Sequence, residues 1–242
     1  MSGGTGGKLE VERKYSVGPG FAVPDLSGLP GVAEVSSPRT YHLTAVYLDT
    51  PGFRLASARI TLRRRTGGTD AGWHLKLPAG TARREVHAPL GTGPGAVPAE
   101  LAGLVSDVTG GEPLRPIARL QTARTVRYLI DAAGEALAEV ADDQVTGSLP
   151  APDGPGPEHA DTAEFWQPSS AWREVEVELD GGTPDLLDAA GRALLAAGAQ
   201  PSPAASKLSL LLTTAGALPA PPLPTPGDGS AAALPPPGGA KH

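Results

Sequence analysis

The chain has 242 residues, of which 40% are apolar and 4% aromatic, and its formal net charge is −6 at neutral pH. The acidic balance argues against a general nucleic-acid binder, and the absence of cysteine excludes disulfides and thiolate metal sites. No run approaches the ~20 apolar residues of a membrane span, and no apolar signal-peptide core follows Met1, so we expect a cytoplasmic protein without a membrane partner.

Segments with alternating apolar and charged side chains recur along the chain and predict β-strands. After a flexible leader over residues 1–8, the first strand covers residues 9–16 and places Glu10, Glu12 and Lys14 on one face, because successive side chains of a strand point to opposite sides. An irregular loop is expected over residues 147–171. Further strands are predicted over residues 41–49, 59–66, 72–77, 82–89, 118–131, 136–145 and 172–179.

Three segments have the apolar spacing of helices, namely residues 97–108, 183–198 and 203–214. The second begins at Thr183-Pro184, which is a typical helix start, and the third carries Lys207. Residues 216–242 are mostly Ala, Pro, Gly and Leu and cannot bury enough surface to offset the entropy of ordering them. We therefore expect one folded domain over residues 9–215, followed by a disordered tail or a linker to a further domain.

The charged strand faces restrict the possible architectures, because isolated charges are too costly to bury in a dry core. In one arrangement the charged faces look out to water, as in an ordinary sandwich. In the other, the sheet closes into a barrel with a polar lumen, and helices cover its apolar outside. The three apolar helix stripes need a sheet surface to cover and favour the second arrangement. We predict an α+β fold with a closed eight-stranded antiparallel barrel and helices packed outside.

The signs of the charges indicate the chemistry that such a lumen would carry. Basic residues come from the middle of the chain and acidic residues from its two ends. Arginine makes bidentate contacts to phosphate oxygens, and paired carboxylates suit Mg²⁺ or Mn²⁺. Together they point to phosphoryl-transfer chemistry on a chain of phosphates. The charges concerned are Arg63, Arg65, Lys76, Arg84, Arg124, Glu10, Glu12, Glu139, Asp143, Glu174 and Glu176.

Several motifs follow the order of a known family. Glu10-Val11-Glu12-Arg13-Lys14 resembles the Glu-x-Glu-x-Lys signature of the CYTH domains, also called triphosphate tunnel metalloenzymes. The segment 47–51 resembles the family's Tyr-Tyr-Asp-Thr-Pro element, residues 62–65 its Leu-Arg-x-Arg strand, and residues 73–76 its following lysine strand. The resemblance covers roughly residues 8–214.

The resemblance implies an eight-stranded tunnel that binds a triphosphate together with Mg²⁺ or Mn²⁺. Glu10, Glu12 and Lys14 would be the catalytic residues. The phosphates would be held by Lys14, Arg63, Arg65, Lys76, Arg84, Arg124 and Lys207. One or two metal ions would be held by Glu10, Glu12, Asp143, Glu174 and Glu176.

Some positions need a choice between neighbours. Arg84 has the strand parity of the apolar Val86, so either a bulge or the alignment to the family decides whether Arg84 or Glu85 faces the lumen, and the family match selects Arg84. Of Asp142 and Asp143 only one can face the lumen, and the family match selects Asp143. Glu139 and Glu178 have the right parity but fall toward a tunnel mouth. Trp73 is assigned to outer packing, and the three histidines of the predicted strands, His42, His74 and His87, to structural roles.

Known members of this family are triphosphatases and class IV adenylate cyclases. The first hypothesis is metal-dependent hydrolysis of inorganic tripolyphosphate or an organic triphosphate such as thiamine triphosphate. The second is an adenylate cyclase, which needs a purine pocket, and no segment of the sequence indicates one. The third is a module that binds polyphosphate without catalysis, since a Pro-rich tail resembles the linker that often follows such domains.

Overall fold

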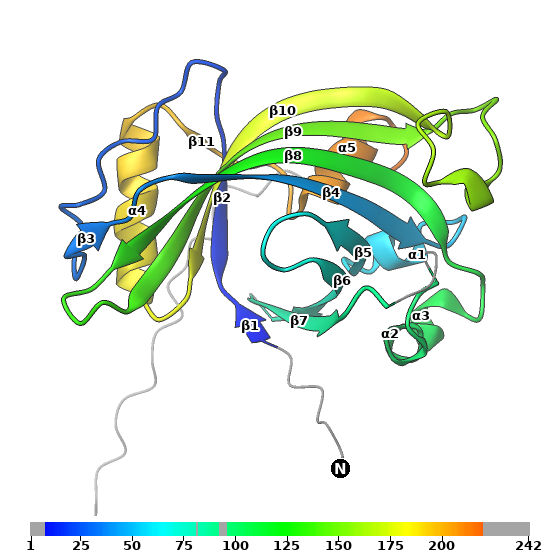
Figure 1. Ribbon diagram of the computed structural model, residues 1–242, viewed down its shortest axis with the longest axis horizontal. Helices are drawn as coiled ribbons and strands as arrows, with labels where there is room; N and C mark the ends of the chain where they lie inside the picture. The colour runs from blue at the N-terminus through cyan, green and yellow to red at the C-terminus, as the bar shows by residue number, and fades with distance from the viewer. Residues whose placement is uncertain (1–7, 81, 92–95, 220–242) are drawn as a thin grey trace, which may run out of the picture.

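The structure is a computed structural model that describes residues 8–80, 82–91 and 96–219 (Figure 1). Most of the predicted leader and tail, residues 1–7 and 220–242, lies outside the described residues. Antiparallel strands dominate, as the alternating sequence predicts, with a few helices packed against them. No helix in the described ranges is both long and apolar enough to cross a membrane.

Within the described residues, ten strands follow one hydrogen-bonded path in the order β1-β7-β6-β5-β4-β8-β9-β10-β2-β11, and a short β3 pairs with β8. In Figure 1 the long strands β4, β8, β9 and β10 arch over β5, β6 and β7. The strands are β1 (Lys8–Glu10), β2 (Glu12–Ser16), β3 (Glu34–Val35), β4 (Arg39–Asp49), β5 (Thr61–Thr66), β6 (Gly72–Ala79), β7 (Ala82–Ala88), β8 (Arg115–Ile130), β9 (Ala136–Pro150), β10 (Trp166–Leu179) and β11 (Gln200–Pro201).

The predicted closed eight-stranded barrel is wrong, because the sheet is an open path with more strands. The predicted first strand is divided at Val11: β1 pairs with β7, whereas β2 pairs with β10. The carbonyl of Val11 accepts a hydrogen bond from the amide of Leu179 at 3.0 Å, where the chain passes from one partner to the other. The N-terminal segment therefore lies between β7 and β10 without making one continuous ladder with both.

The helices are short except for α4. They are α1 (Arg54–Ser57), α2 (Ala99–Leu104), α3 (Ser106–Thr109), α4 (Pro184–Ala196) and α5 (Lys207–Thr214), with a 3₁₀ turn η1 (Pro157–His159). The single helix predicted over residues 97–108 is two helices, with Val105 between them. The predicted irregular loop is also shorter, because β9 and β10 stay paired as far as Pro150 and Trp166, so only residues 151–165 connect them.

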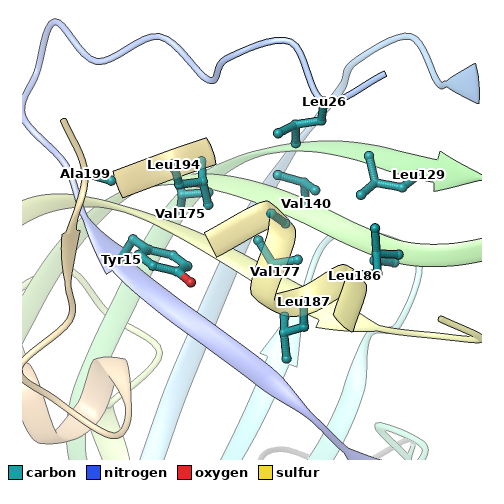
Figure 2. Packing of buried hydrophobic residues seen from close by; sticks show 12 residues of the cluster. Tyr15, Leu26, Leu129, Val140, Val175, Val177, Leu186, Leu187, Leu194 and Ala199 are labelled. Carbon is teal, nitrogen blue, oxygen red and sulfur yellow. The ribbon is translucent and has the colours of Figure 1, made fainter. Parts of the chain in front are cut away.

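Two apolar clusters lie on the outer face of the sheet and direct the charged strand faces inward. In the first, α4 places Leu187 and Leu194 against Val175 and Val177 of β10 (Figure 2). The second gathers α1, α2 and α3 around Trp73 and the apolar side of β5, β6 and β7. Both clusters agree with the prediction that helices cover the apolar outside.

Helix α5 departs from that prediction, because it packs against the inner face of the sheet. Its Leu208 and Leu211 belong to an apolar cluster with Ala45 and Leu120. Ala45 and Leu120 also line a cavity enclosed by the sheet. Gly147 permits the close approach: a Cβ at this position would lie 2.7 Å from a methyl carbon of Leu211. The helix therefore fills part of the interior and brings its first residue, Lys207, to the charged groups.

Candidate functional site

A cavity of about 680 Å³ lies inside the curved sheet and is lined mainly by charged side chains. Its lining comes from β1, β2, β4, β5, β6, β7, β8, β9, β10, α2 and α5, so distant parts of the sequence meet here. Nine predicted site residues line it: Glu10, Glu12, Lys14, Arg63, Arg65, Lys76, Arg124, Glu176 and Lys207. Asp143 and Glu174 are buried beside the cavity, and Glu139 and Glu178 also line it.

Arg84 is the predicted site residue that the structure places elsewhere. Its side chain is exposed, whereas Arg83 and Glu85 line the cavity from the same strand. Val86 packs into the outer cluster with Trp73, and alternation along β7 gives Arg84 the same outward direction. The inward direction expected for Arg84 is therefore wrong, and β7 contributes a carboxylate where an arginine was expected.

The wall formed by β5 carries two arginines, of which Arg65 is buried and Arg63 half-buried. Arg63 donates a hydrogen bond from Nη1 to the Tyr47 hydroxyl at 3.4 Å, and Arg65 pairs with Asp70. Among the described residues, the Nε atoms of Arg63 and Arg65 have no hydrogen-bond partner. Burial, followed by repulsion from Arg63 and Arg124, lowers the pKa of Arg65 to about 9. This wall holds positive charge that the protein does not fully neutralise.

The opposite wall holds a network in which cations and carboxylates alternate. Arg124 donates to both oxygens of Asp143, at 2.8 and 2.6 Å, and to Glu176 at 2.7 Å. Lys14 donates to Glu12 at 2.7 Å and also contacts Glu176. Burial opposes the charge on Glu176, but the surrounding cations outweigh it and hold its pKa well below the usual value. Every member of this network is paired; Asp143 and Glu176 are buried, and Glu12, Lys14 and Arg124 are partly buried.

Lys207 joins the same network from α5. Its Nζ lies 2.9 Å from Asp143, 2.7 Å from Glu174 and 2.7 Å from Glu176. Burial disfavours the ammonium ion, but these carboxylates raise the pKa of Lys207 far above its ordinary value. Lys207 therefore stays charged and is engaged with carboxylates rather than pointing free into the cavity.

A third group of charges surrounds Glu10. Lys76 donates to Glu10 at 2.5 Å, and Glu85 contacts Nδ1 of His74 at 2.7 Å. Burial and the neighbouring Glu85 raise the pKa of Glu10 to about 8, against the opposing charge of Lys76. Burial lowers the pKa of His74 to about 4, and its Nε2 lies 2.9 Å from the carbonyl of Asp70.

Sequence reasoning missed Glu85, Asp70 and His74 as parts of the site. The alternation of β7 already contained the signal for Glu85, since Val86 had to face the apolar outside. For Asp70, which belongs to the turn between β5 and β6, the sequence gives no comparable sign. The choice of Asp143 over Asp142 agrees with the structure, because Asp142 pairs with Arg173 on the other face.

Asp49, the aspartate of the segment 47–51, has a structural role. Its carboxylate accepts hydrogen bonds from the backbone amides of Thr50 and Leu55 through Oδ1, and of Ala56 through Oδ2, at 2.7, 2.9 and 2.9 Å. Asp49 thus satisfies amides around the start of α1, which would otherwise lack partners. Tyr47 of the same segment lines the cavity.

Within the described ranges, one group of three carboxylates is close enough together to hold a metal ion. Asp143, Glu174 and Glu176 each offer an oxygen, and these oxygens lie within 4.8 Å of one another. Oxygen donors of this kind suit the hard cations Mg²⁺ and Mn²⁺. Glu10 and Glu12 belong to the same cavity but are held by Lys76 and Lys14, respectively.

The chain is similar to one protein family over most of its length. The model of the CYTH domain matches residues 8–206, and the chain therefore belongs to the CYTH domain family. Two proteins of Mycobacterium tuberculosis, named "Uncharacterized protein MT2285" and "Uncharacterized protein Rv2226", are each 46% identical to it over 224 residues. The match covers 89% of this chain and 43% of each relative, so the chain spans less than half of their length.

Solved structures share the architecture at low sequence identity. A proposed adenylate cyclase of Bacillus halodurans is 18% identical, with a TM-score of 0.53, over 84% of this chain and 97% of that protein. A Hippeastrum protein, a proposed adenylyl cyclase with a dominant triphosphatase activity, is 15% identical with a TM-score of 0.44 over 85% and 95% of the two chains. The first of these matches supports the fold.

Proposed function

We propose that this protein hydrolyses a triphosphate, inorganic tripolyphosphate or an organic triphosphate, in its charged cavity with the help of Mg²⁺ or Mn²⁺. The observation that carries the proposal is that Arg63 and Arg65 line the cavity with buried Nε atoms that lack partners in the described structure. The Nε atoms of Arg64 and Arg119 also lack partners, but neither of these side chains lines the cavity. Buried polar atoms without partners are rare and destabilising. Phosphate oxygens would give both Nε atoms a hydrogen-bond acceptor and would neutralise both guanidinium charges, which favours a polyanion as the ligand of this wall.

The rest of the cavity suits a bound phosphate chain. Lys76 lines the cavity next to the arginine wall, and Lys14 and Arg124 line it on the opposite side. A triphosphate between the walls would therefore meet cations on both sides. Members of the CYTH family are divalent-metal-dependent triphosphatases or cyclases, and the carboxylates of this cavity are oxygen donors of the right chemistry for such an ion.

In the proposed reaction, the oxygen of a water molecule attacks the terminal phosphorus while the bond to the bridging oxygen breaks, which releases phosphate and diphosphate. Arg63 and Arg65 hold the chain and neutralise negative charge on its oxygens. Glu12 lies in the cavity beside Lys14 and orients the attacking water. A bound metal ion would supply further neutralisation and favour ionisation of that water.

The lining residues favour hydrolysis over cyclisation. A cyclase has to hold a purine, and Tyr47 is the lone phenyl or indole side chain among the described lining residues. Trp73 faces the outer cluster, with 1% of its surface exposed. The cavity therefore provides phosphate contacts on several walls, and its aromatic lining among the described residues consists of Tyr47 and the imidazoles of His74 and His87.

The test is an assay of purified protein with tripolyphosphate, ATP and thiamine triphosphate in Mg²⁺ or Mn²⁺, with phosphate and cyclic AMP both measured. We expect phosphate release from tripolyphosphate, reduced roughly 100-fold or more by Arg63→Ala through loss of a charge contact in the transition state. Arg64→Ala, one residue away on the outward side of β5, is the matched control and should retain activity. Cyclic AMP as the main product, or binding without turnover, would contradict the proposal.

A further inference from the structure

Lys207 occupies the middle of the carboxylate group that could hold a metal ion. Its Nζ lies 2.7–2.9 Å from oxygens of Asp143, Glu174 and Glu176, and the candidate ligand oxygens lie within 4.8 Å of one another. The single ammonium group therefore lies at ion-pair distance from all three carboxylates. The group already contains a cation, and that cation belongs to the protein.

A divalent ion and the lysine cannot share this position. Mg²⁺ lies about 2.0–2.1 Å from its oxygen ligands, so an ion bound to these carboxylates would stand at or beside Nζ. Two positive charges that close repel strongly in a buried site. Two further cations add to this repulsion, since Lys14 and Arg124 also contact Glu176.

We propose that Lys207 and a divalent metal ion compete for the carboxylates of Asp143, Glu174 and Glu176. Lys207 holds the group together in the metal-free protein, and it leaves when a metal ion enters. The displaced ammonium then lies at the cavity surface, where it can contact a phosphate. The identity of the ion, Mg²⁺ or Mn²⁺, rests on the proposed function.

The structure allows this exchange without unfolding α5. Lys207 is the first residue of the helix, and Ser206 and Ser209 close a capping box around that end. Leu208, Leu211 and Leu212 are almost fully buried and anchor the helix against the sheet. The flexible side chain of Lys207 can therefore move while its backbone stays in place.

The first test measures Mn²⁺ binding to the full chain without substrate, by calorimetry or by the paramagnetic resonance of free Mn²⁺. We expect Lys207→Met to bind Mn²⁺ roughly tenfold or more tightly than the wild type, because a competing charge is gone. Arg64→Met removes a positive charge outside the cavity and should bind as the wild type does. Equal or weaker binding by Lys207→Met would overturn the proposal.

A second measurement uses the unmodified chain and decides the matter if Lys207→Met does not fold. Acetic anhydride labels accessible lysines, and mass spectrometry reports the labelled fraction at Lys207. We expect saturating Mn²⁺ to increase labelling of Lys207 several-fold, and unchanged labelling would overturn the proposal. Neither measurement depends on turnover, so tripolyphosphate hydrolysis with unchanged labelling would refute this exchange and leave the proposed function intact.

Discussion

The cations that line the cavity differ in what surrounds them. Lys14, Arg124 and Lys207 have carboxylate partners at ion-pair distance, whereas Arg63 contacts the hydroxyl of Tyr47. Buried charges are stable when they are paired and costly when they are not. The first group therefore contributes to the folded structure, and Arg63 is the residue whose charge an incoming anion would neutralise.

Glu176 is the shared partner of the paired group, so its removal should be costly. We expect Glu176→Gln to lower the free energy of unfolding by about 3 kcal/mol, because three cations would lose a buried carboxylate. Urea unfolding measures the change. Asp188→Asn is the control, since the Arg13–Asp188 pair is largely exposed and should change the stability by less than about 1 kcal/mol. A loss for Glu176→Gln no larger than the control would contradict the assignment.

The raised pKa of Glu10 predicts a pH dependence. Its folded-state pKa of about 8 lies above the ordinary value of 4.5, so the folded protein binds the extra proton between these values. The resulting stability is fully present below pH 4.5 and is lost as the pH rises through 8. In metal-free buffer with a chelator, the unfolding free energy of the wild type should fall from pH 5 to pH 8 relative to that of Glu10→Gln. Parallel curves would contradict the raised pKa.

Alternation predicted the faces of Glu10, Arg63 and Glu176, because a side-chain period of two leaves no other choice within a regular strand. At Arg84 the error came from the family pattern, which was preferred to alternation, whereas the parity of Val86 gives the outward direction that the structure shows. The ion-pair partners could not be predicted, since they depend on the register between strands that are far apart in the sequence.

At the scale of elements, α5 is the helix whose position was not predictable. Its leucines resemble those of α4, and an apolar stripe does not show which face of a sheet it will cover. The distinguishing feature is on the sheet: Gly147 leaves room for Leu211 on the inner face. The buried end of α5 then brings Lys207 to the carboxylates.

Gly147 therefore provides a test of this placement. We expect Gly147→Ala to lower the free energy of unfolding by roughly 1–2 kcal/mol, because the added methyl group overpacks the contact with Leu211. The matched control is Gly103→Ala in α2, where a Cβ meets no atom within 4 Å. It should be neutral or slightly stabilising, since alanine favours helix more than glycine does. Equal stability of the two variants, measured by thermal unfolding, would contradict the packing of α5 against Gly147 on the inner face of the sheet.

At the scale of the whole molecule, the strands enclose charge because helices and loops cover the apolar faces outside. The type of most elements was predictable, but the number of strands and the closure of the sheet were not. The division at Val11 depends on which strands the two halves of one segment pair with, and local pattern contains no information on that. The prediction of a charged interior is unaffected by this error, because it depends on which face of each strand carries the charged side chains and not on the number of strands.

The central claim is that the enclosed cavity is a polyphosphate site built around the wall of Arg63 and Arg65. The most direct measurement is the binding of tripolyphosphate by calorimetry to the wild type, to the double variant Arg63→Ala/Arg65→Ala and to Arg64→Ala. The account predicts binding by the wild type and by Arg64→Ala, and an affinity roughly 100-fold lower or undetectable for the double variant, from the loss of two charge-assisted contacts. Equal affinity of the three proteins, or no binding to the wild type, would contradict it.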